Sequence, residues 1–229
     1  MTTLDVISGG RAILGIGAAW NEEESRAYGF AFPPVRERLD RLEEAVQICR
    51  TMLDSPRAEF EGRYYRVEGA YNIPRPVRAR VPILIGGGGE RRTLRLVARY
   101  ADLCNVIGDA ATVRHKLDVL REHCEAEGRD VTEIVKTAHA GIVVVDETED
   151  GVRRRLESLA ASPPPLLRGL DAEQLSQRLV CGTPDRLAER LRAFVEAGAD
   201  GVTLSIRGVE DLEPVELVGA AARSAGLTG

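Results

Sequence analysis

The sequence is poor in lysine, cysteine and histidine, and each shortage argues against a kind of site. Only two of its 31 basic residues are lysines, Lys116 and Lys136, and neither stands at a predicted strand end, where a barrel aldolase places its Schiff-base lysine. The four cysteines lack CxxC spacing and the three histidines are not grouped, so no metal site and no disulfide framework is predicted. An aldolase or isomerase of the phosphate-binding barrel type is therefore the least favoured interpretation.

Long apolar runs and net positive charge are also missing. No stretch of about 18 apolar residues and no secretory signal pattern occurs. The formal net charge is −5, which argues against a nucleic-acid or polybasic membrane surface. Scattered cysteines are typical of free thiols in a reducing compartment. We therefore expect a cytoplasmic protein that takes a small-molecule substrate and binds neither nucleic acid nor membrane.

Strands and helices alternate along the chain. Five buried strands are predicted, beginning near Arg11, Pro82, Ala101, Gly141 and Asp200. Helices are predicted over residues 36–53, 90–99, 112–127, 183–198 and 213–225, with a small hairpin around 60–67. Such alternation indicates repeated βα units around a parallel sheet. Residues 146–171 contain three consecutive prolines, and beyond a helix over 153–161 we interpret them as a mobile surface excursion.

The first predicted strand carries two glycines. Gly15 and Gly17 alternate with Ile16, so one face of the strand's end has no side chain and a ligand or another backbone can approach closely. The alternative is that the glycines only relieve crowding in a core. Because ligands of α/β folds bind at the carboxyl ends of strands, residues 18–21 are expected beside any such ligand.

Four consecutive glycines join the second predicted strand to a helix, and they are Gly86, Gly87, Gly88 and Gly89. Backbone N–H groups at a helix N-terminus favour an anion such as phosphate, although a plain tight turn would use the same residues. Arg91 and Arg92 follow. Either can add charge to a phosphate site, or be a solvated helix residue.

Four polar or aromatic residues near the predicted strand ends are candidates for a role in the site. Asn21 can cap a helix over 22–27 or present its amide to a ligand. Asn105 lies near the carboxyl end of its strand, where it can line a pocket. Asp102 is expected to fix a loop or a neighbouring arginine rather than act as a base. Trp20 can cover a planar ring or plug a hydrophobic gap, and we favour the plug.

Four segments in order along the chain carry a family resemblance. They are LDVISGGRAILGIG over residues 4–17 with Trp20-Asn21-Glu22, Phe32-Pro33-Pro34 with Arg38-Leu39 and Glu43-Glu44, PILIGGGG over 82–89 with Ala101-Asp102, and Gly182-Thr183-Pro184 with AGADGV over 197–202. Together they resemble the luciferase-like monooxygenase family, in particular its bacterial members described as F420-dependent oxidoreductases.

The resemblance implies a fold and an activity. The family fold is a (β/α)8 TIM barrel, and aligned to it this chain begins just before the fourth strand. The implied fold class is α/β, an incomplete barrel of strands 4 to 8 with outer helices, in one N-terminally truncated luciferase-like domain over 1–229. The implied function is a flavin- or F420-dependent oxidoreductase or monooxygenase that transfers hydride or activates oxygen on a small organic substrate. Arginine usage hints at a GC-rich genome, where F420 is common, but the choice between F420 and FMN stays open.

The resemblance also implies site residues. Asn21 corresponds to a family asparagine that contacts the cofactor, and residues 86–89 correspond to the phosphate loop, with Gly88 and Gly89 the best candidates. Ala18 stands where some F420-dependent sugar-phosphate dehydrogenases carry a catalytic glutamate, which points away from that chemistry. No catalytic residue is assigned. The predicted cofactor-binding residues are Asn21, Gly86, Gly87, Gly88, Gly89, Arg91 and Asn105.

An alternative function follows from the strands that the alignment leaves out. A partial barrel has two free parallel edges, at the strands near Arg11 and Asp200, and free edges pair with other chains. We therefore expect a homo-oligomer formed through these edges. On this alternative the chain is a catalytically inactive partial barrel with a structural or assembly role.

Overall fold

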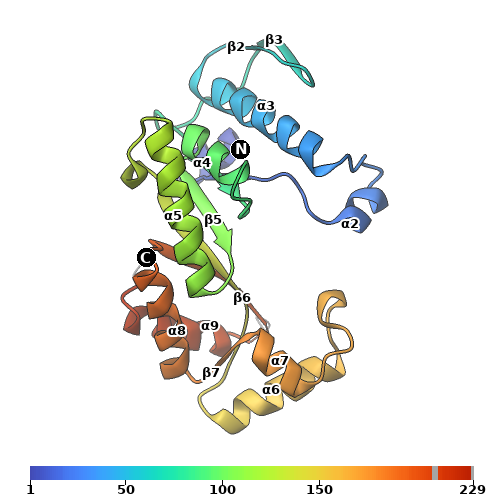
Figure 1. The fold of residues 1–229 in the computed structure, drawn as a ribbon, viewed down its shortest axis with the longest axis vertical. Coiled ribbons are helices and arrows are strands. Elements are labelled where there is room, and N and C mark those ends of the chain that lie inside the picture. The colour runs from blue at the N-terminus through green and yellow to red at the C-terminus, as the bar shows by residue number, and fades with distance from the viewer. Residues whose placement is uncertain (208–210, 228–229) are drawn as a thin grey trace. The chain divides into compact units, whose positions relative to one another are not determined.

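The computed structural model describes residues 1–207 and 211–227, and the chain forms two compact units. Unit 1 comprises residues 1–105 and 118–135, and unit 2 comprises residues 106–117 and 136–229. The division falls inside the strand β5 (Leu103–Ile107) and inside the helix α5 (Ala110–Ala126). Figure 1 follows the chain from its N-terminus in blue to its C-terminus in red.

Unit 1 is built on parallel strands. β4 (Ile83–Gly86) pairs in parallel with β1 (Leu14–Ile16) on one side and with β5 on the other. Ile83 and Ile85 are fully buried, and α4 (Thr93–Tyr100) packs against β4 with Leu94 and Val97 equally buried. Since side chains alternate along a strand, the opposite face of β4 carries Leu84 and Gly86. One face of this sheet is therefore covered by a helix, and on the other face the glycines Gly15 and Gly86 alternate with larger side chains such as Leu84.

Unit 1 contains further helices and a hairpin besides this sheet. They are α1 (Thr2–Ile7), α2 (Glu22–Ala27), α3 (Val35–Asp54), β2 (Ala58–Glu61), β3 (Arg66–Ala70) and the short 3₁₀ helix η1 (Val131–Glu133). β2 and β3 form an antiparallel hairpin, and β2 packs on α3. The Glu44 carboxylate of α3 accepts the N–H groups of Arg63, Tyr64 and Tyr65 at 2.8–3.0 Å. The hairpin predicted around 60–67 is confirmed, and Glu44 fixes its turn to α3.

Unit 2 is built on the long strand β6 (Val135–Val145), whose first residue belongs to unit 1. β7 (Val180–Gly182) and β8 (Gly201–Ile206) both pair with β6 in parallel, and Val143 is a register partner of both Val180 and Ile206. The helices of this unit are α6 (Glu149–Ala161), α7 (Ala172–Arg178), α8 (Pro184–Glu196) and α9 (Glu213–Ser224), with the 3₁₀ helix η2 (Pro165–Leu167).

Two hydrophobic clusters form the core of unit 2. Val143 and Val145 pack with Leu187, Leu191 and Val218 of α8 and α9. Val144 faces the other way and packs with side chains of the segment from α6 to α7, which are Val152, Leu156, Leu167, Leu175 and Leu179. Successive residues of one strand thus enter different clusters, as the period of two requires.

All five predicted strands are present, and the alternating α/β class is confirmed for each unit. The elements that were not predicted are α7, the three-residue strand β7 and the two 3₁₀ helices. The segment 146–171 was expected to contain a mobile surface excursion. Leu167 of this segment is instead 6% exposed and packs in a core cluster. α4 begins at Thr93 and not at residue 90, because residues 90–92 form a turn.

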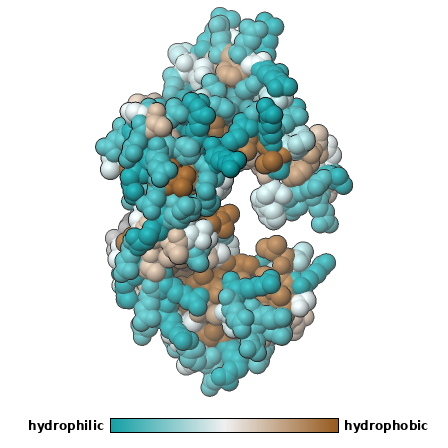
Figure 2. Space-filling view, in the orientation of Figure 1, coloured by the Kyte–Doolittle hydropathy of each residue, from teal (hydrophilic) through white to brown (hydrophobic). Residues whose placement is uncertain are grey.

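Hydrophilic side chains predominate on the face shown in Figure 2, and hydrophobic side chains show among them in separate patches. Within residues 1–207 and 211–227, no helix is long and apolar enough to cross a membrane. The four cysteines are not joined by disulfides.

Candidate functional site

The three parallel strands β1, β4 and β5 form, near their carboxyl ends, a floor with few side chains. Gly86 of β4 is the register partner of Asn105 of β5. On the other side, a Cβ added to Gly17 would lie 3.4 Å from the carbonyl oxygen of Gly86. A Cβ added to Gly15 or to Gly86 would meet nothing within 4 Å. The glycines therefore do not relieve crowding in a core; they leave the floor open to a ligand.

The glycine loop leaves this floor and leads into α4. Gly87 has φ +125°, which favours glycine, and its N–H donates to the Asn105 carbonyl at 3.0 Å. The next two N–H groups, of Gly88 and Gly89, donate to no acceptor within residues 1–207 and 211–227. The N-cap residue of α4, Arg92, makes no side-chain capping bond. Unsatisfied N–H groups and the positive end of a helix dipole thus lie together after β4.

The two arginines after the glycines have different surroundings. Arg92 donates to the Arg36 carbonyl at 3.1 Å and to the Asp40 carboxylate at 2.5 Å, both on α3. That hydrogen bond is the largest effect that holds the pKa of Asp40 below its usual value. Arg91 is exposed, and its guanidinium bonds to none of the described residues. Arg91 is therefore the arginine that remains available to an anion.

Asn21 is the N-cap of α2. Its side-chain oxygen Oδ1 accepts the N–H of Glu24 at 3.1 Å, and its carbonyl accepts the hydroxyl of Ser25 at 2.8 Å. The capping interpretation is confirmed. The amide nitrogen Nδ2 donates to no acceptor in the described part of the chain, where no hydrogen bond joins Asn21 to the glycine loop. The structure thus brings Gly86, Gly87 and Asn105 together by register and hydrogen bonding, but not Asn21.

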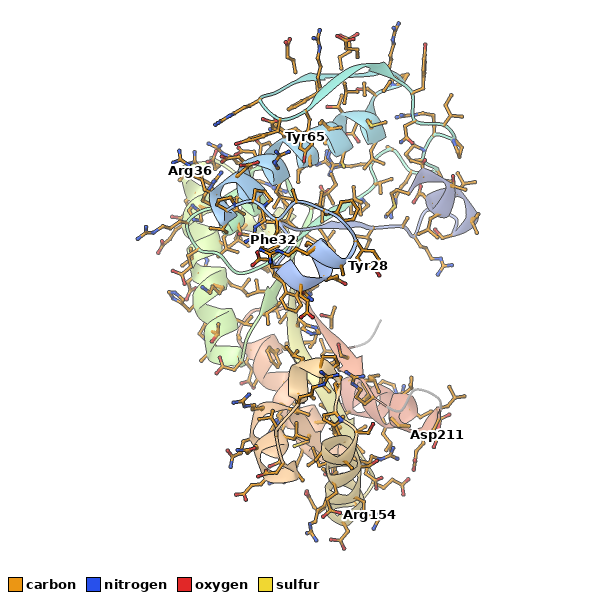
Figure 3. The ribbon with its side chains drawn as sticks, turned by 90° about the vertical axis from the view of Figure 1, so that its right-hand side faces the viewer. Tyr28, Phe32, Arg36, Tyr65, Arg154 and Asp211 are labelled. Atoms are coloured by element: carbon orange, nitrogen blue, oxygen red, sulfur yellow. The ribbon has the colours of Figure 1, made fainter. Side chains whose placement is uncertain are left out.

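A cleft of about 470 Å³ opens at the end of β1. Gly17 and Ala18 line it together with Phe32 and Tyr65, which are labelled in Figure 3. Arg38 crosses this region: it stacks on Phe32 with 4.0 Å between the guanidinium carbon and the ring centre, and it donates to the Ala18 carbonyl at 3.2 Å and the Ala19 carbonyl at 2.5 Å.

The same contacts of Arg38 fix the loop between β1 and α2. Ala19 has φ +59°, and it is the only described residue other than glycine in the left-handed region. This loop carries the residues that precede Asn21. Arg38 therefore holds the end of the strand that leads to the N-cap.

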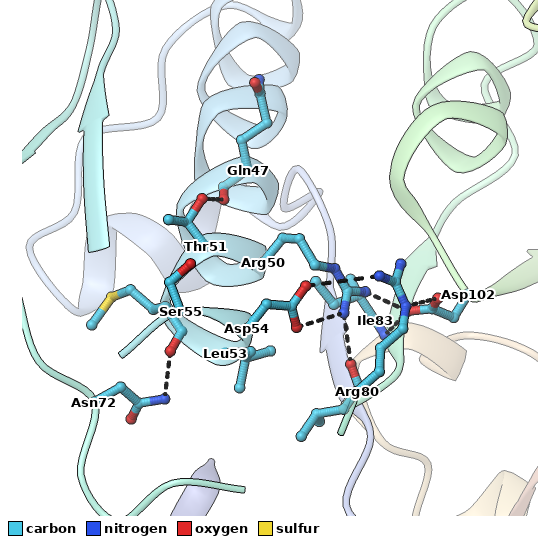
Figure 4. A network of polar contacts seen from close by, with 12 residues as sticks. Gln47, Arg50, Thr51, Leu53, Asp54, Ser55, Asn72, Arg80, Ile83 and Asp102 are labelled. Atoms are coloured by element: carbon cyan, nitrogen blue, oxygen red, sulfur yellow. Dashed lines mark hydrogen bonds and ion pairs between the residues drawn. The ribbon is translucent and has the colours of Figure 1, made fainter. Parts of the chain in front are cut away.

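Asp102 joins three parts of unit 1 (Figure 4). Its carboxylate accepts from Arg50 on α3, from Arg80 at 2.8 Å and from the N–H of Ile83 at 2.8 Å. Burial, the largest single effect, raises its pKa, but the hydrogen bonds from Ile83 and Arg80 and the charges of Arg50 and Arg80 lower the pKa below the usual value. The prediction that Asp102 fixes neighbouring arginines is confirmed.

One prediction for this region is wrong. Trp20 is 78% exposed, so it does not plug a hydrophobic gap in the described structure. Two histidines make structural contacts, His123 through Nε2 to the Glu90 carbonyl at 2.7 Å and His139 through Nδ1 to the Thr203 hydroxyl at 3.1 Å. No group of three or more His, Cys, Asp or Glu side chains that can hold a metal ion occurs in the described ranges.

Thr93 is a residue of this site that the sequence analysis missed. Its side chain lies against the glycine loop: a Cβ added to Gly89 would be 2.8 Å from its Oγ1, and one added to Gly87 would be 3.3 Å from its Cγ2. Thr93 is the first residue of α4 and is 8% exposed. A hydroxyl residue in the first turn after a glycine run was the signal available in the sequence.

With this geometry established, comparison with known proteins decides the family. The sequence profile of the luciferase-like monooxygenases matches residues 1–201. The chain belongs to this family. An F420-dependent glucose-6-phosphate dehydrogenase from Kineococcus radiotolerans is 30% identical over 215 residues, which cover 86% of this chain and 63% of that protein. A protein of the same description from Nocardia farcinica is 28% identical over 237 residues, covering 90% and 66%.

Solved structures share the fold at lower identity. An F420-dependent secondary alcohol dehydrogenase, solved with an F420-acetone adduct, has a TM-score of 0.80 at 19% identity, covering 98% of this chain and 72% of that chain. EDTA monooxygenase from Chelativorans sp. BNC1 has a TM-score of 0.78 at 20% identity, covering 98% and 68%. The fold is thus similar to that of luciferase-like barrel enzymes. The chain spans less than two thirds of the length of the first curated relatives that it matches.

Proposed function

We propose that this chain carries the phosphate-binding part of a cofactor site, for F420 or FMN, in an oxidoreductase of the luciferase-like type. The observation that carries the proposal is the pair of unsatisfied N–H groups of Gly88 and Gly89, at the end of a parallel strand and beside a floor that glycines leave open. A flavin or deazaflavin nucleotide presents a phosphate and a flat ring, and these surfaces suit both.

Each residue would have a distinct task. Gly88 and Gly89 would donate to phosphate oxygens, and the exposed Arg91 would add positive charge. Gly86 would leave room over the floor, and the Asn105 side chain would line it. The Nδ2 group of Asn21, which its capping bond leaves available, would donate to the cofactor. The bound group supplies the redox chemistry, and the protein positions it and excludes water.

The names of the relatives support both cofactors without choosing between them. Proteins named as F420-dependent dehydrogenases are among the similar proteins, and so is a riboflavin lyase that was solved with a modified FMN. The substrate would be a small organic molecule, oxidised or reduced by hydride transfer or by reaction with oxygen. Ala18 stands at a position where the resemblance implies a glutamate in sugar-phosphate dehydrogenases, so we do not propose glucose 6-phosphate as the substrate.

A direct binding experiment tests the proposal. We expect the purified protein to quench FMN fluorescence or change F420 fluorescence in a saturable titration. Gly88→Asp should abolish binding, because it places a carboxylate at the phosphate position. The control is Gly128→Asp, which adds the same charge at an exposed glycine where an added Cβ meets nothing within 4 Å. Gly128 has φ +68°, and aspartate is one of the residues that tolerate this left-handed conformation. Absence of binding of either cofactor by the wild-type chain would count against the proposal.

A second candidate, an assembly role, is favoured by the first strand. β1 pairs with β4, and no second partner strand occurs in the described ranges. Ile13 beside it is 45% exposed. We propose that residues 1–229 form one luciferase-like domain equivalent to strands 4 to 8 of the family barrel, and that this free edge joins a second copy. If the chain is catalytically inactive, this assembly with a second copy would be its only function.

Light scattering after size-exclusion chromatography tests the assembly. The wild-type chain should elute as a dimer or larger species, and Ile13→Lys should shift it to a monomer by placing a charge beside the edge. Leu166→Lys is the matched control, because Leu166 is 73% exposed on η2. A wild-type chain that stays monomeric at all concentrations would exclude the assembly.

A further inference from the structure

The Thr93 side chain is buried beneath the glycine loop, yet its hydroxyl has no hydrogen-bond partner. Its exposed fraction is 8%, and Oγ1 bonds to no atom of residues 1–207 and 211–227. In a helix a threonine hydroxyl commonly donates to the carbonyl four residues earlier. Here that carbonyl belongs to Gly89, and it accepts the N–H of Leu94 at 3.0 Å instead. Oγ1 is not among the unpartnered side-chain atoms that are fully shielded from solvent, so the largely buried side chain keeps its hydroxyl oxygen accessible.

The Thr93 hydroxyl lies next to Gly89 of the glycine loop. A Cβ at Gly89 would come 2.8 Å from Oγ1, a distance at which one of the two groups must move. The methyl Cγ2 is turned toward Gly87. The hydroxyl is thus turned toward the same residue whose N–H is unsatisfied. The Gly89 position must lack a side chain so that the Thr93 hydroxyl can reach the space beside the loop.

We infer that the Thr93 hydroxyl is the third donor of an oxyanion cradle, together with the N–H groups of Gly88 and Gly89, and that it binds a non-bridging oxygen of a phosphate ester. This inference rests on the proposed function and names a further binding residue of that site. The eight-residue helix α4 begins at Thr93 without a side-chain cap, so its positive end supports the same anion. Arg92 is held by Asp40, so of the two arginines after the loop only Arg91 would add charge to the three neutral donors of the cradle.

Because the proposed cradle binds phosphate, the experiment compares cofactor forms with and without a phosphate. Thr93→Val keeps the shape of the side chain and removes the hydroxyl, whereas Thr93→Ser keeps the hydroxyl. The probes are FMN and riboflavin, which differ by the phosphate, and in the same way F420 and its phosphate-free chromophore. For the cofactor that the wild-type chain binds, Thr93→Val should weaken binding of the phosphorylated form roughly tenfold or more, as expected for a lost hydrogen bond to a charged group. Binding of the phosphate-free form should not change, and Thr93→Ser should bind like the wild type.

A purely structural role for Thr93 predicts a different result. If the hydroxyl stabilised the free protein, Thr93→Val would lower its melting temperature and weaken both forms of the cofactor equally. On our inference the hydroxyl is unsatisfied before binding, so Thr93→Val without cofactor should melt at the wild-type temperature or above it. Wild-type binding of FMN or F420 with unchanged affinity in Thr93→Val would overturn this inference alone. No binding by the wild type would overturn the proposed function, and this inference with it.

Discussion

The carbonyl oxygen of Asn105 accepts the N–H of Gly87 at 3.0 Å, so the glycine loop is tied to the neighbouring strand at the residue where it leaves the sheet. This bond sets the direction in which the next two N–H groups emerge. It also separates two kinds of glycine. Gly86 lies before the bond with open space around its Cβ position, whereas Gly87 has a backbone conformation that other residues rarely adopt.

Substitutions at these two glycines should therefore act differently. Gly86→Val should leave the free energy of unfolding within about 1 kcal/mol of wild type, because nothing occupies the space, but it should lower cofactor affinity by obstructing the floor. Gly87→Ala should lower the stability itself by about 1–2 kcal/mol, because φ is +125°. Urea denaturation and FMN or F420 titration of both variants check this. A stable Gly87→Ala variant, or unimpaired binding by Gly86→Val, would contradict it.

Asn21 should show two separable roles. Asn21→Asp keeps a capping oxygen for the Glu24 N–H, so the stability should fall by less than about 0.5 kcal/mol, whereas cofactor binding should weaken because the Nδ2 donor is lost. Asn21→Ala should lose the cap and cost about 1 kcal/mol. Thermal melts and titrations of the two variants measure both effects. Full binding by Asn21→Asp would leave Asn21 with the capping role alone.

The Asp102 network should give unit 1 a stability that depends on pH. The folded pKa of Asp102 lies below its usual value, so its contribution is present above the unfolded pKa of about 3.9 and is lost as the pH falls through the folded pKa. Asp102→Asn should be less stable than wild type by roughly 2 kcal/mol at pH 7, and the difference should shrink below pH 4.

Urea denaturation at pH 7, 5 and 3 checks this expectation. The matched control is Asp118→Asn, which removes an exposed ion pair with Arg121, whose side chains are about half exposed. That pair should contribute less than about 1 kcal/mol at any pH. A difference between Asp102→Asn and wild type that stayed constant from pH 7 to pH 3 would refute the assignment.

Arg91 and Arg92 should affect different properties. Arg91→Ala should weaken cofactor binding and reduce its sensitivity to salt, because an exposed charge acts on the anion through screened attraction, and the melting temperature should not move. Arg92→Ala should cost about 0.5–1 kcal/mol of stability, because it breaks the contact with Asp40. Titrations at low and high salt with thermal melts of each variant distinguish the two. The opposite pattern would mean that Arg92 reaches the ligand.

The left-handed residue Ala19 should be a site of stored strain. Ala19→Gly should raise the free energy of unfolding by about 0.5 kcal/mol, since the relief of an alanine at positive φ exceeds the entropy cost of glycine by a small margin. Ala18→Gly is the control and should lower stability, because Ala18 is not in that conformation. Chemical denaturation of both variants measures this, and equal effects would show that the loop carries no strain.

Much of this fold follows from local pattern. The stripe of Leu42, Val46 and Leu53 predicts α3, and the apolar runs bounded by glycine predict β4 and β6. β7 was not predicted because three residues are too few to show alternation, whereas the equally short β1 lies in a longer apolar run that glycines bound. α7 lies beyond three prolines, and its capping box, in which Asp171 and Gln174 bond reciprocally, is the signal that marks its start.

The candidate site was predictable in part for a physical reason. Consecutive glycines, such as Gly88 and Gly89, indicate exposed backbone, so the loop could be located from the sequence. The separation of Arg91 from Arg92 could not, because it depends on Asp40, some fifty residues earlier in the chain and brought close only by folding. The exposure of Trp20 and the unsatisfied hydroxyl of Thr93 likewise depend on neighbours that a linear pattern does not specify.

Neither unit is a continuous stretch of polypeptide, because the chain passes from one to the other at residues 105/106, 117/118 and 135/136. During synthesis, the segment around Ile134, which is fully buried, emerges from the ribosome long after the glycine loop. The first unit therefore cannot finish folding until part of the second has already been made. In a nascent chain arrested near residue 117, we expect the glycine loop not to have reached its final conformation. A deletion in the middle of the gene should prevent both units from folding, because each contains residues from that region.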